Sequence, residues 1–145
     1  MFKHLLVPTD GSLLSAKAAR SAIEFAKAVG ARITTLSVVE PYHYPALADS
    51  SYLPNQGRYE KEMQDDVRRY VNEIAGFAAA AGVPCDTRVG CSFSPYEEIT
   101  NTAKDLGCDV IFMASHGRKG INRLLVGSET QKVLAHTTLP VMVYR

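Results

Sequence analysis

Short apolar segments alternate along this chain with longer segments of helical periodicity, and this alternation most constrains the fold. Residues 4–8, 33–39 and 110–114 are compact apolar or β-branched runs, which are typical of strands buried on both faces. Alanine-rich segments with a helical repeat follow two of these runs. Because strands separated by helices pair in parallel, the pattern predicts an α/β fold in which helices cover both faces of a parallel sheet.

The full pattern predicts five strands and four helices. We expect strands at 4–8, 33–39, 83–89, 110–114 and 140–144, and helices at 13–29, 57–81, 94–106 and 128–135. Gly30, Gly82 and Gly107 stand where glycine ends a helix, and Ser94 stands at an N-cap position before a proline. The connection over residues 40–56 is longer than most, which favours a functional or mobile segment.

Composition excludes several classes of protein. A length of 145 residues predicts one domain, residues 1–145. The count of 16 Lys and Arg against 15 Asp and Glu argues against nucleic-acid and acidic-membrane binding, both of which favour a broad basic surface. No segment approaches the roughly 18 consecutive apolar residues of a membrane span. We therefore expect a soluble, cytoplasmic protein without nucleic-acid or membrane partners.

The cysteines and histidines form no recognisable metal site. Cys85, Cys91 and Cys108 are odd in number and irregularly spaced, which fits a reducing compartment. We expect each of them to be a small buried or half-buried apolar residue. The histidines outside the 115–117 segment lack ligand spacing, so no metal site is expected among His4, His43 and His136.

A glycine-rich, basic loop follows the strand at 110–114. It runs from Ser115 to the expected helix start at Ser128, with Arg118, Lys119 and Arg123 as its cations and no acidic residue between Gly117 and Ser128. Glycine lets the backbone approach a phosphate closely, and the free N–H groups of a helix start attract anions. On spacing alone, phosphate binding and a surface loop whose glycines only turn the chain are equally consistent with this segment.

Asp10 follows the first strand, in the sequence Pro8-Thr9-Asp10-Gly11-Ser12. Open parallel sheets bind ligands beyond the carboxyl ends of their strands, so this position and the glycine loop meet the same requirement. Asp-Gly is also a common turn dipeptide, and a purely turn-forming aspartate is the alternative. Ser12 and Ser15 are expected to cap the following helix.

Ser115-His116 resembles a nucleophile and its base, but it lacks the GxSxG pattern that would expose such a serine. Neighbouring side chains of an extended segment point to opposite faces, so we expect His116 to be a loop residue near the ligand and predict no catalytic residue. An aromatic cluster lies on and next to the long connection, and it either covers the ligand, meets a partner or packs onto the domain. Its members are Tyr42, His43, Tyr44, Tyr52 and Tyr59.

Three motifs make the chain similar over its whole length to the universal stress protein family. Residues 6–12 resemble the family's first strand and turn, and residues 139–143 resemble its last strand. The ATP-binding members carry the signature Gly-x-x-Gly, nine residues, Gly, then Ser or Thr. Gly117, Gly127 and Ser128 match its last three elements, whereas Ala114 replaces the first glycine and adds a methyl group beside the ribose or phosphates.

This resemblance implies the strand order 3-2-1-4-5 and an adenine nucleotide alpha-hydrolase-like, Rossmann-like fold. It also implies a site in which Asp10 binds ribose or adenine, Val38 lines the adenine and the glycine loop cradles the phosphates. The implied nucleotide contacts are Pro8, Thr9, Asp10, Val38, Met113, Ala114, Gly117, Arg118, Gly127, Ser128 and Glu129.

The function implied is that of a small stress-response regulator that binds ATP or another adenine nucleotide, with Mg or Mn on the phosphates and Ser128 near that ion. Family members form homodimers, here expected through the final strand at Val141 to Val143. Two alternatives remain open: a dimeric interaction protein of the same fold that needs no nucleotide, and a slow ATP hydrolase or phosphotransfer enzyme. ATP, AMP and a cyclic nucleotide each fit the adenine contact.

Overall fold

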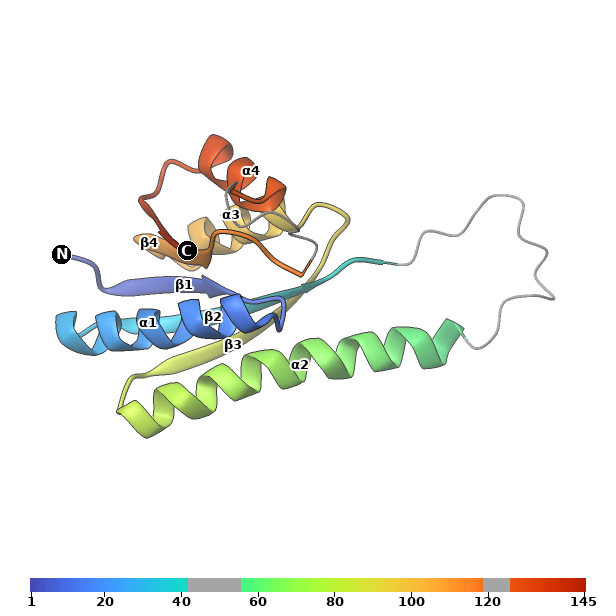
Figure 1. The fold of residues 1–145 in the computed structure, drawn as a ribbon, viewed down its shortest axis with the longest axis horizontal. Coiled ribbons are helices and arrows are strands. Elements are labelled where there is room, and N and C mark those ends of the chain that lie inside the picture. The colour runs from blue at the N-terminus through green and yellow to red at the C-terminus, as the bar shows by residue number, and fades with distance from the viewer. Residues whose placement is uncertain (42–55, 119–125) are drawn as a thin grey trace.

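A computed structural model describes residues 1–41, 56–118 and 126–145 and shows one five-stranded sheet between helices (Figure 1). The strands are β1 (His4–Pro8), β2 (Arg32–Val39), β3 (Cys85–Cys91), β4 (Val110–Ala114) and β5 (Val141–Tyr144). The helices are α1 (Leu13–Val29), α2 (Gln56–Ala81), α3 (Pro95–Asp105) and α4 (Ser128–His136). The order is β3-β2-β1-β4-β5 and every pairing is parallel, which confirms the predicted fold class and strand order.

Helices cover both faces of the sheet, α1 and α2 on one side and α3 and α4 on the other (Figure 1). Successive residues of β1 serve the two layers: Leu5 and Val7 pack towards α1, whereas Leu6 packs towards α3 and α4. All three are fully buried. A strand buried on both faces must be apolar at every position, which explains the unbroken apolar run.

Most element boundaries agree with the prediction, and β3 is the main exception. The predicted strand at 83–89 is wrong by two residues, because the structure places β3 at Cys85–Cys91. Val83 is buried, and its N–H donates to Ala78 O at 2.9 Å, so this residue completes the end of α2 instead of entering the sheet. At the end of α1, Gly30 adopts φ +68° and its N–H donates to Ala26 O, as expected of a C-cap glycine.

The three cysteines differ in exposure. Cys85 is half-buried and Cys108 is buried, as predicted, and burial raises the pKa of both thiols to about 11. The same expectation is wrong for Cys91, which is exposed. Its strand, β3, lies at the edge of the sheet, and most of its side chains face solvent.

His4 is a buried histidine at the start of β1. Its side chain is 4% exposed, and its Nε2 is hydrogen-bonded to Thr34 Oγ1 at 2.8 Å. Burial, followed by the positive charge of Arg32, lowers the pKa of His4 below its usual 6.5, against the opposing carboxylates of Asp109 and Asp86. The folded protein therefore favours the neutral imidazole.

We expect the protein to lose stability as the pH falls below about 6.5. In that range the unfolded chain binds a proton at His4 more readily than the folded chain does, so protonation favours unfolding. Urea unfolding at about pH 7.5 and about pH 5.5 measures the effect. The free energy of unfolding should fall further for wild type than for His4→Gln. Equal losses in the two proteins would contradict this assignment.

The amino-terminal half of α2 extends beyond the edge of the sheet (Figure 1). Its charged residues are largely exposed, as predicted, with ion pairs between Arg58 and Glu62 at 2.9 Å and between Arg69 and Asp66 at 2.7 Å. Tyr59 is 46% exposed on this helix. Six residues named by the sequence analysis lie outside the described residues: Tyr42, His43, Tyr44, Tyr52, Lys119 and Arg123.

Candidate functional site

The turn after β1 and the loop after β4 leave the sheet side by side. The two strands are neighbours, with Leu5 opposite Val110 and Leu6 opposite Ile111. Beyond their carboxyl ends, the backbone N–H of Arg118 donates to Asp10 Oδ2 at 2.7 Å. This hydrogen bond joins the two segments that the sequence analysis singled out at the carboxyl edge of the sheet.

The Asp10 carboxylate also organises its own turn. Its Oδ1 accepts a hydrogen bond from the N–H of Ser12 at 2.9 Å, and Ser12 caps α1 by accepting from Ser15 N at 3.1 Å. Burial raises the pKa of Asp10, but hydrogen bonds from Ser12, Arg118 and Ser15 outweigh it and leave the pKa below its usual 3.8. Asp10 is therefore an ionised link between two loops as well as a turn residue.

Two glycines of the loop permit close approaches: a side chain would clash at Gly117 and would be crowded at Gly127. A Cβ atom at Gly117 would lie 2.3 Å from Asp10 Oδ2, well inside van der Waals contact. A Cβ atom at Gly127 would lie 3.1 Å from the Cα of His116. The Gly127 N–H donates to Ser115 O at 2.7 Å, so the two ends of the loop meet next to Asp10.

The start of α4 has the geometry of an anion site. Gly127 is its N-cap residue and Ser128, which is exposed, its first residue. The first N–H groups of a helix have no partner within it and carry the positive end of the helix dipole. Thr130 Oγ1 donates to Ala114 O at 3.0 Å and holds the start of α4 against the end of β4. Thr130 was not among the predicted site residues, although its place in the first turn after the signature serine was visible in the sequence.

The Glu129 side chain contacts the neighbouring helix. Its Oε2 accepts a hydrogen bond from Tyr96 N at 3.0 Å, and its Oε1 pairs with Lys132 Nζ at 2.9 Å. Ser94 is the N-cap residue of α3, as predicted, but its side chain forms no hydrogen bond to the start of the helix. A carboxylate from α4 instead satisfies an N–H group in the first turn of α3. Glu129 can then contact a ligand through its backbone amide, as the family resemblance implies.

The Arg118 side chain lies on α2. Its guanidinium is stacked 4.8 Å from the centroid of the Tyr70 ring, and its Nη2 donates to the Tyr70 hydroxyl. The Tyr70 ring in turn occupies the space beside Gly11, where a Cβ atom would lie 2.4 Å from it. Tyr70 was not among the predicted site residues, because it lies within a long helix and belongs to no motif.

The remaining candidate contacts lie at the carboxyl ends of their strands. Val38 and Met113 belong to the hydrophobic core on the α3 and α4 side. Ala114 belongs to the core on the α1 side. Pro8 ends β1 and is half-buried, and Thr9 is buried, with its N–H donating to Leu36 O at 2.8 Å. Hydrogen bonds and close approaches therefore bring together Asp10, Gly117, Arg118 and Gly127. Val38 and Met113 belong to the same hydrophobic core, without a direct contact to that group among those described.

Ser115 and His116 contact each other, so the expectation that they point to opposite faces is wrong. Ser115 Oγ and His116 Nδ1 form a hydrogen bond of 3.1 Å, because the chain leaves extended geometry at the end of β4. Ser115 is 3% exposed, and its N–H donates to Tyr144 O at 2.7 Å. A buried and hydrogen-bonded serine of this kind stabilises the start of the loop.

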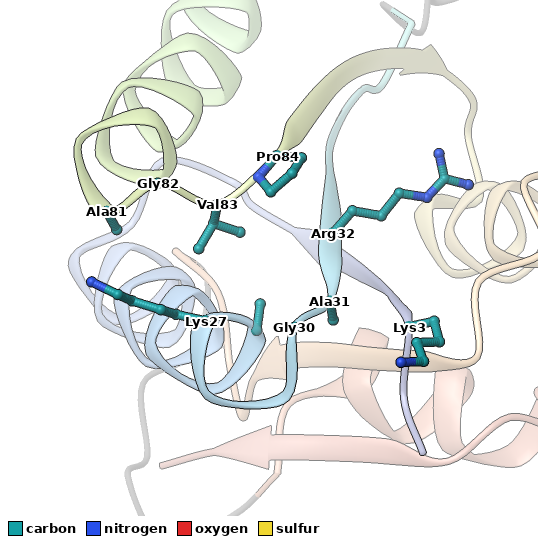
Figure 2. Close-up of a pocket in the computed structure, with 10 residues that line it drawn as sticks. Lys3, Lys27, Gly30, Ala31, Arg32, Ala81, Gly82, Val83 and Pro84 are labelled. Carbon is teal, nitrogen blue, oxygen red and sulfur yellow. The ribbon is translucent and has the colours of Figure 1, made fainter.

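A hollow of about 370 Å³ lies at the opposite, amino-terminal edge of the sheet (Figure 2). Lys3, Lys27 and Arg32 line it, but Figure 2 shows Lys27 and Arg32 extending in opposite directions. The backbone N–H groups of Ala31, Arg32 and Val83 are already bonded to protein carbonyls. The hollow therefore lacks the free N–H donors present at the start of α4.

The described part of the chain has two further negative features. It contains no group of three or more His, Cys, Asp or Glu residues arranged to hold a metal ion. None of its helices combines the length and the apolar character that crossing a bilayer requires.

The comparisons with known proteins identify the family. The profile of the Universal stress protein family matches residues 1–145. This chain belongs to the universal stress protein family. It is 30% identical to the universal stress protein YxiE of Bacillus subtilis over the full length of both chains. It is also 28% identical to the universal stress protein MJ0531 of Methanocaldococcus jannaschii, over all of this chain and 83% of that protein.

Solved structures of universal stress proteins share the fold of this family member. The UspA protein from Lactobacillus plantarum superposes with a TM-score of 0.86 at 24% identity, over 99% of this chain and 98% of that chain. A universal stress protein in complex with cAMP superposes with a TM-score of 0.69 at 21% identity, over 99% and 97%. One from Archaeoglobus fulgidus in complex with dAMP gives 0.65 at 14% identity, over 100% and 98%.

Proposed function

We propose that this universal stress protein binds an adenine nucleotide, with ATP as the expected ligand, and acts as a nucleotide-dependent regulator. The ligand would lie at the carboxyl edge of β1 and β4, with its phosphates at the start of α4. The observation that carries the proposal is the Asp10–Arg118 hydrogen bond, which brings the turn after β1 to the glycine loop before α4.

The chemistry of this edge suits a nucleotide. The N–H groups at the start of α4 attract phosphate, and the Ser128 hydroxyl adds a donor or a ligand for a phosphate-bound Mg or Mn ion. The carboxylate of Asp10 is ionised and accepts hydrogen bonds, and the hydroxyl groups of a ribose could donate them. The two structural neighbours in complex with cAMP and dAMP support an adenine nucleotide as the class of ligand.

Ala114 replaces the first glycine of the ATP signature, and its position is compatible with binding. Its side chain is 8% exposed and packs in the core on the α1 side of the sheet. Thr130 bonds its carbonyl oxygen and so holds α4 in place despite the substitution. The methyl group is therefore accommodated by the core that faces away from α3 and α4.

The cellular arrangement belongs to the same proposal. Residues 1–145 would act as a single cytoplasmic domain that pairs with a second copy through β5. All four residues of β5 are half-buried, and the strand lies at the edge of the sheet. An apolar edge strand is a ready surface for pairing with another chain, and a homodimer would cover it.

Equilibrium dialysis with labelled ATP and AMP tests nucleotide binding. We expect wild type to bind, and Gly127→Val to bind at least about tenfold more weakly, because the added side chain meets His116 where even a Cβ would be 3.1 Å away. Gly57→Val, at a glycine with no atom within 4 Å of a built Cβ, is the matched control and should bind as wild type does. Absence of binding by wild type at millimolar ATP would overturn the proposal.

A further inference from the structure

Tyr70 connects α2 to both loops of the candidate nucleotide site. Its ring fills the space beside Gly11 in the turn after β1, where a built Cβ would be 2.4 Å away. The same ring carries the guanidinium of Arg118, from the loop after β4, at 4.8 Å, and its hydroxyl accepts a hydrogen bond from that group. One side chain from a third element therefore contacts the two segments that meet at Asp10.

We propose that Tyr70 is a positioning residue for nucleotide binding, which holds Gly117 and Arg118, at the start of the glycine loop, in place beside the Asp10 turn. This inference rests on the proposed function and adds a residue from α2 to its site. Neither the signature motifs nor the carboxyl ends of the strands include this helix position.

Arg118 is fixed at two points, and this is why the contact matters. Its backbone N–H bonds Asp10, and its side chain is held by Tyr70. Gly117 precedes it and would otherwise give the backbone at this position much conformational freedom. A loop ordered before the ligand arrives loses less entropy on binding, so the affinity for nucleotide rises. Tyr70 thus acts on the ligand through Arg118.

The surroundings of Tyr70 fit a support for the loops. The hollow behind the ring is lined by Thr9, Gly11 and Ile74, among others, and has a volume of about 20 Å³. That volume holds one water molecule and no nucleotide. Tyr70 therefore contacts Gly11 and Arg118 and leaves no room for a nucleotide behind its ring.

The chain contains a matched control for this contact. Arg20 of α1 is stacked over the Phe77 ring of α2 at 4.2 Å, so it forms the same kind of arginine–aromatic contact with the same helix. Arg20 belongs to neither of the loops that meet at Asp10. Removing its guanidinium tests the general loss of an α2 contact without disturbing the glycine loop.

The first experiment measures the affinity for ATP by titration calorimetry in Tyr70→Phe, Arg118→Met, the double variant and Arg20→Met. We expect Tyr70→Phe and Arg118→Met each to weaken ATP binding by about 3- to 10-fold. The double variant should bind ATP no more weakly than the single variant with the lower affinity. Arg20→Met should bind as wild type does. Unchanged affinity in Tyr70→Phe, or additive losses in the double variant, would overturn the proposal.

The second experiment needs no nucleotide and separates the two proposals. The Nε–H signal of Arg118 in an NMR spectrum is assigned by its absence in Arg118→Met. We expect this signal to move in Tyr70→Phe and to lose its ring-induced shift in Tyr70→Leu, with both variants still folded. An unmoved signal contradicts the Tyr70 contact itself. A shifted signal in a protein that binds no nucleotide overturns the proposed function and, with it, the role of Tyr70 in binding.

Discussion

Replacing Asp10 with alanine is expected to lower the free energy of unfolding by about 2–3 kcal/mol and to weaken nucleotide binding more than about tenfold. The carboxylate accepts hydrogen bonds from Ser12 N at 2.9 Å and from Arg118 N at 2.7 Å. Hydrogen bonds to a charged acceptor contribute about 1.5–3 kcal/mol each. Alanine removes both, but water can reach the exposed N–H of Arg118, so the expected loss is close to that of one such bond. Urea unfolding and ATP titration on the same samples measure the two effects.

Asp10→Asn is the matched control for this result. It keeps an oxygen for the N–H of Ser12, but it turns an NH₂ group towards the N–H of Arg118, so a donor faces a donor. We expect a stability between those of wild type and Asp10→Ala, with binding still weakened. Wild-type stability in Asp10→Ala would show that the carboxylate does not hold the two loops together.

Gly117→Ala tests the same contact from the other side. A Cβ atom would lie 2.3 Å from Asp10 Oδ2, so the carboxylate has to move and its hydrogen bond from Arg118 N is lost. We expect about tenfold weaker nucleotide binding and a loss of about 1–2 kcal/mol in the free energy of unfolding. ATP titration and urea unfolding measure the change.

Two further variants make this prediction specific. Gly76→Ala, in α2 with no atom within 4 Å of a built Cβ, should bind as wild type does and be more stable by up to about 1 kcal/mol, since alanine favours helix. In an Asp10→Ala background the space beside Gly117 is free, so adding Gly117→Ala should change little. A full additional loss in that background would place the damage elsewhere.

The elements of the fold were largely predictable from local pattern. β1 and β4 are buried on both faces and are therefore apolar throughout, whereas α1 is buried on one face and therefore has a helical repeat of apolar residues. The structure has all three elements at the predicted residues. Where a boundary was wrong, a tertiary contact decided it. The N–H of Val83 completes α2, so β3 begins two residues later than predicted. At the start of α3, Ser94 is the N-cap residue as predicted, but the Glu129 side chain supplies the hydrogen bond that the serine side chain does not.

The order of the strands in the sheet could not be predicted in this way, because periodicity does not indicate which strands are neighbours. The order β3-β2-β1-β4-β5 came from the family resemblance, which rested on motifs at both ends of the chain, and the structure confirms it. That order places β1 beside β4. It therefore brings the Asp10 turn to the glycine loop across more than a hundred residues of sequence.

By itself, the sequence determined which residue types stand at the strand ends: an aspartate after β1, and a run of glycines and cations without acidic residues before α4. Local chemistry and spacing are properties of residues that are close in sequence, so they can be identified from the sequence alone. Only the tertiary structure decided how those groups are held. Gly117 is needed because Asp10 lies against it, and Arg118 is anchored because Tyr70 reaches it from α2. Such contacts join distant segments, and packing alone brings them together.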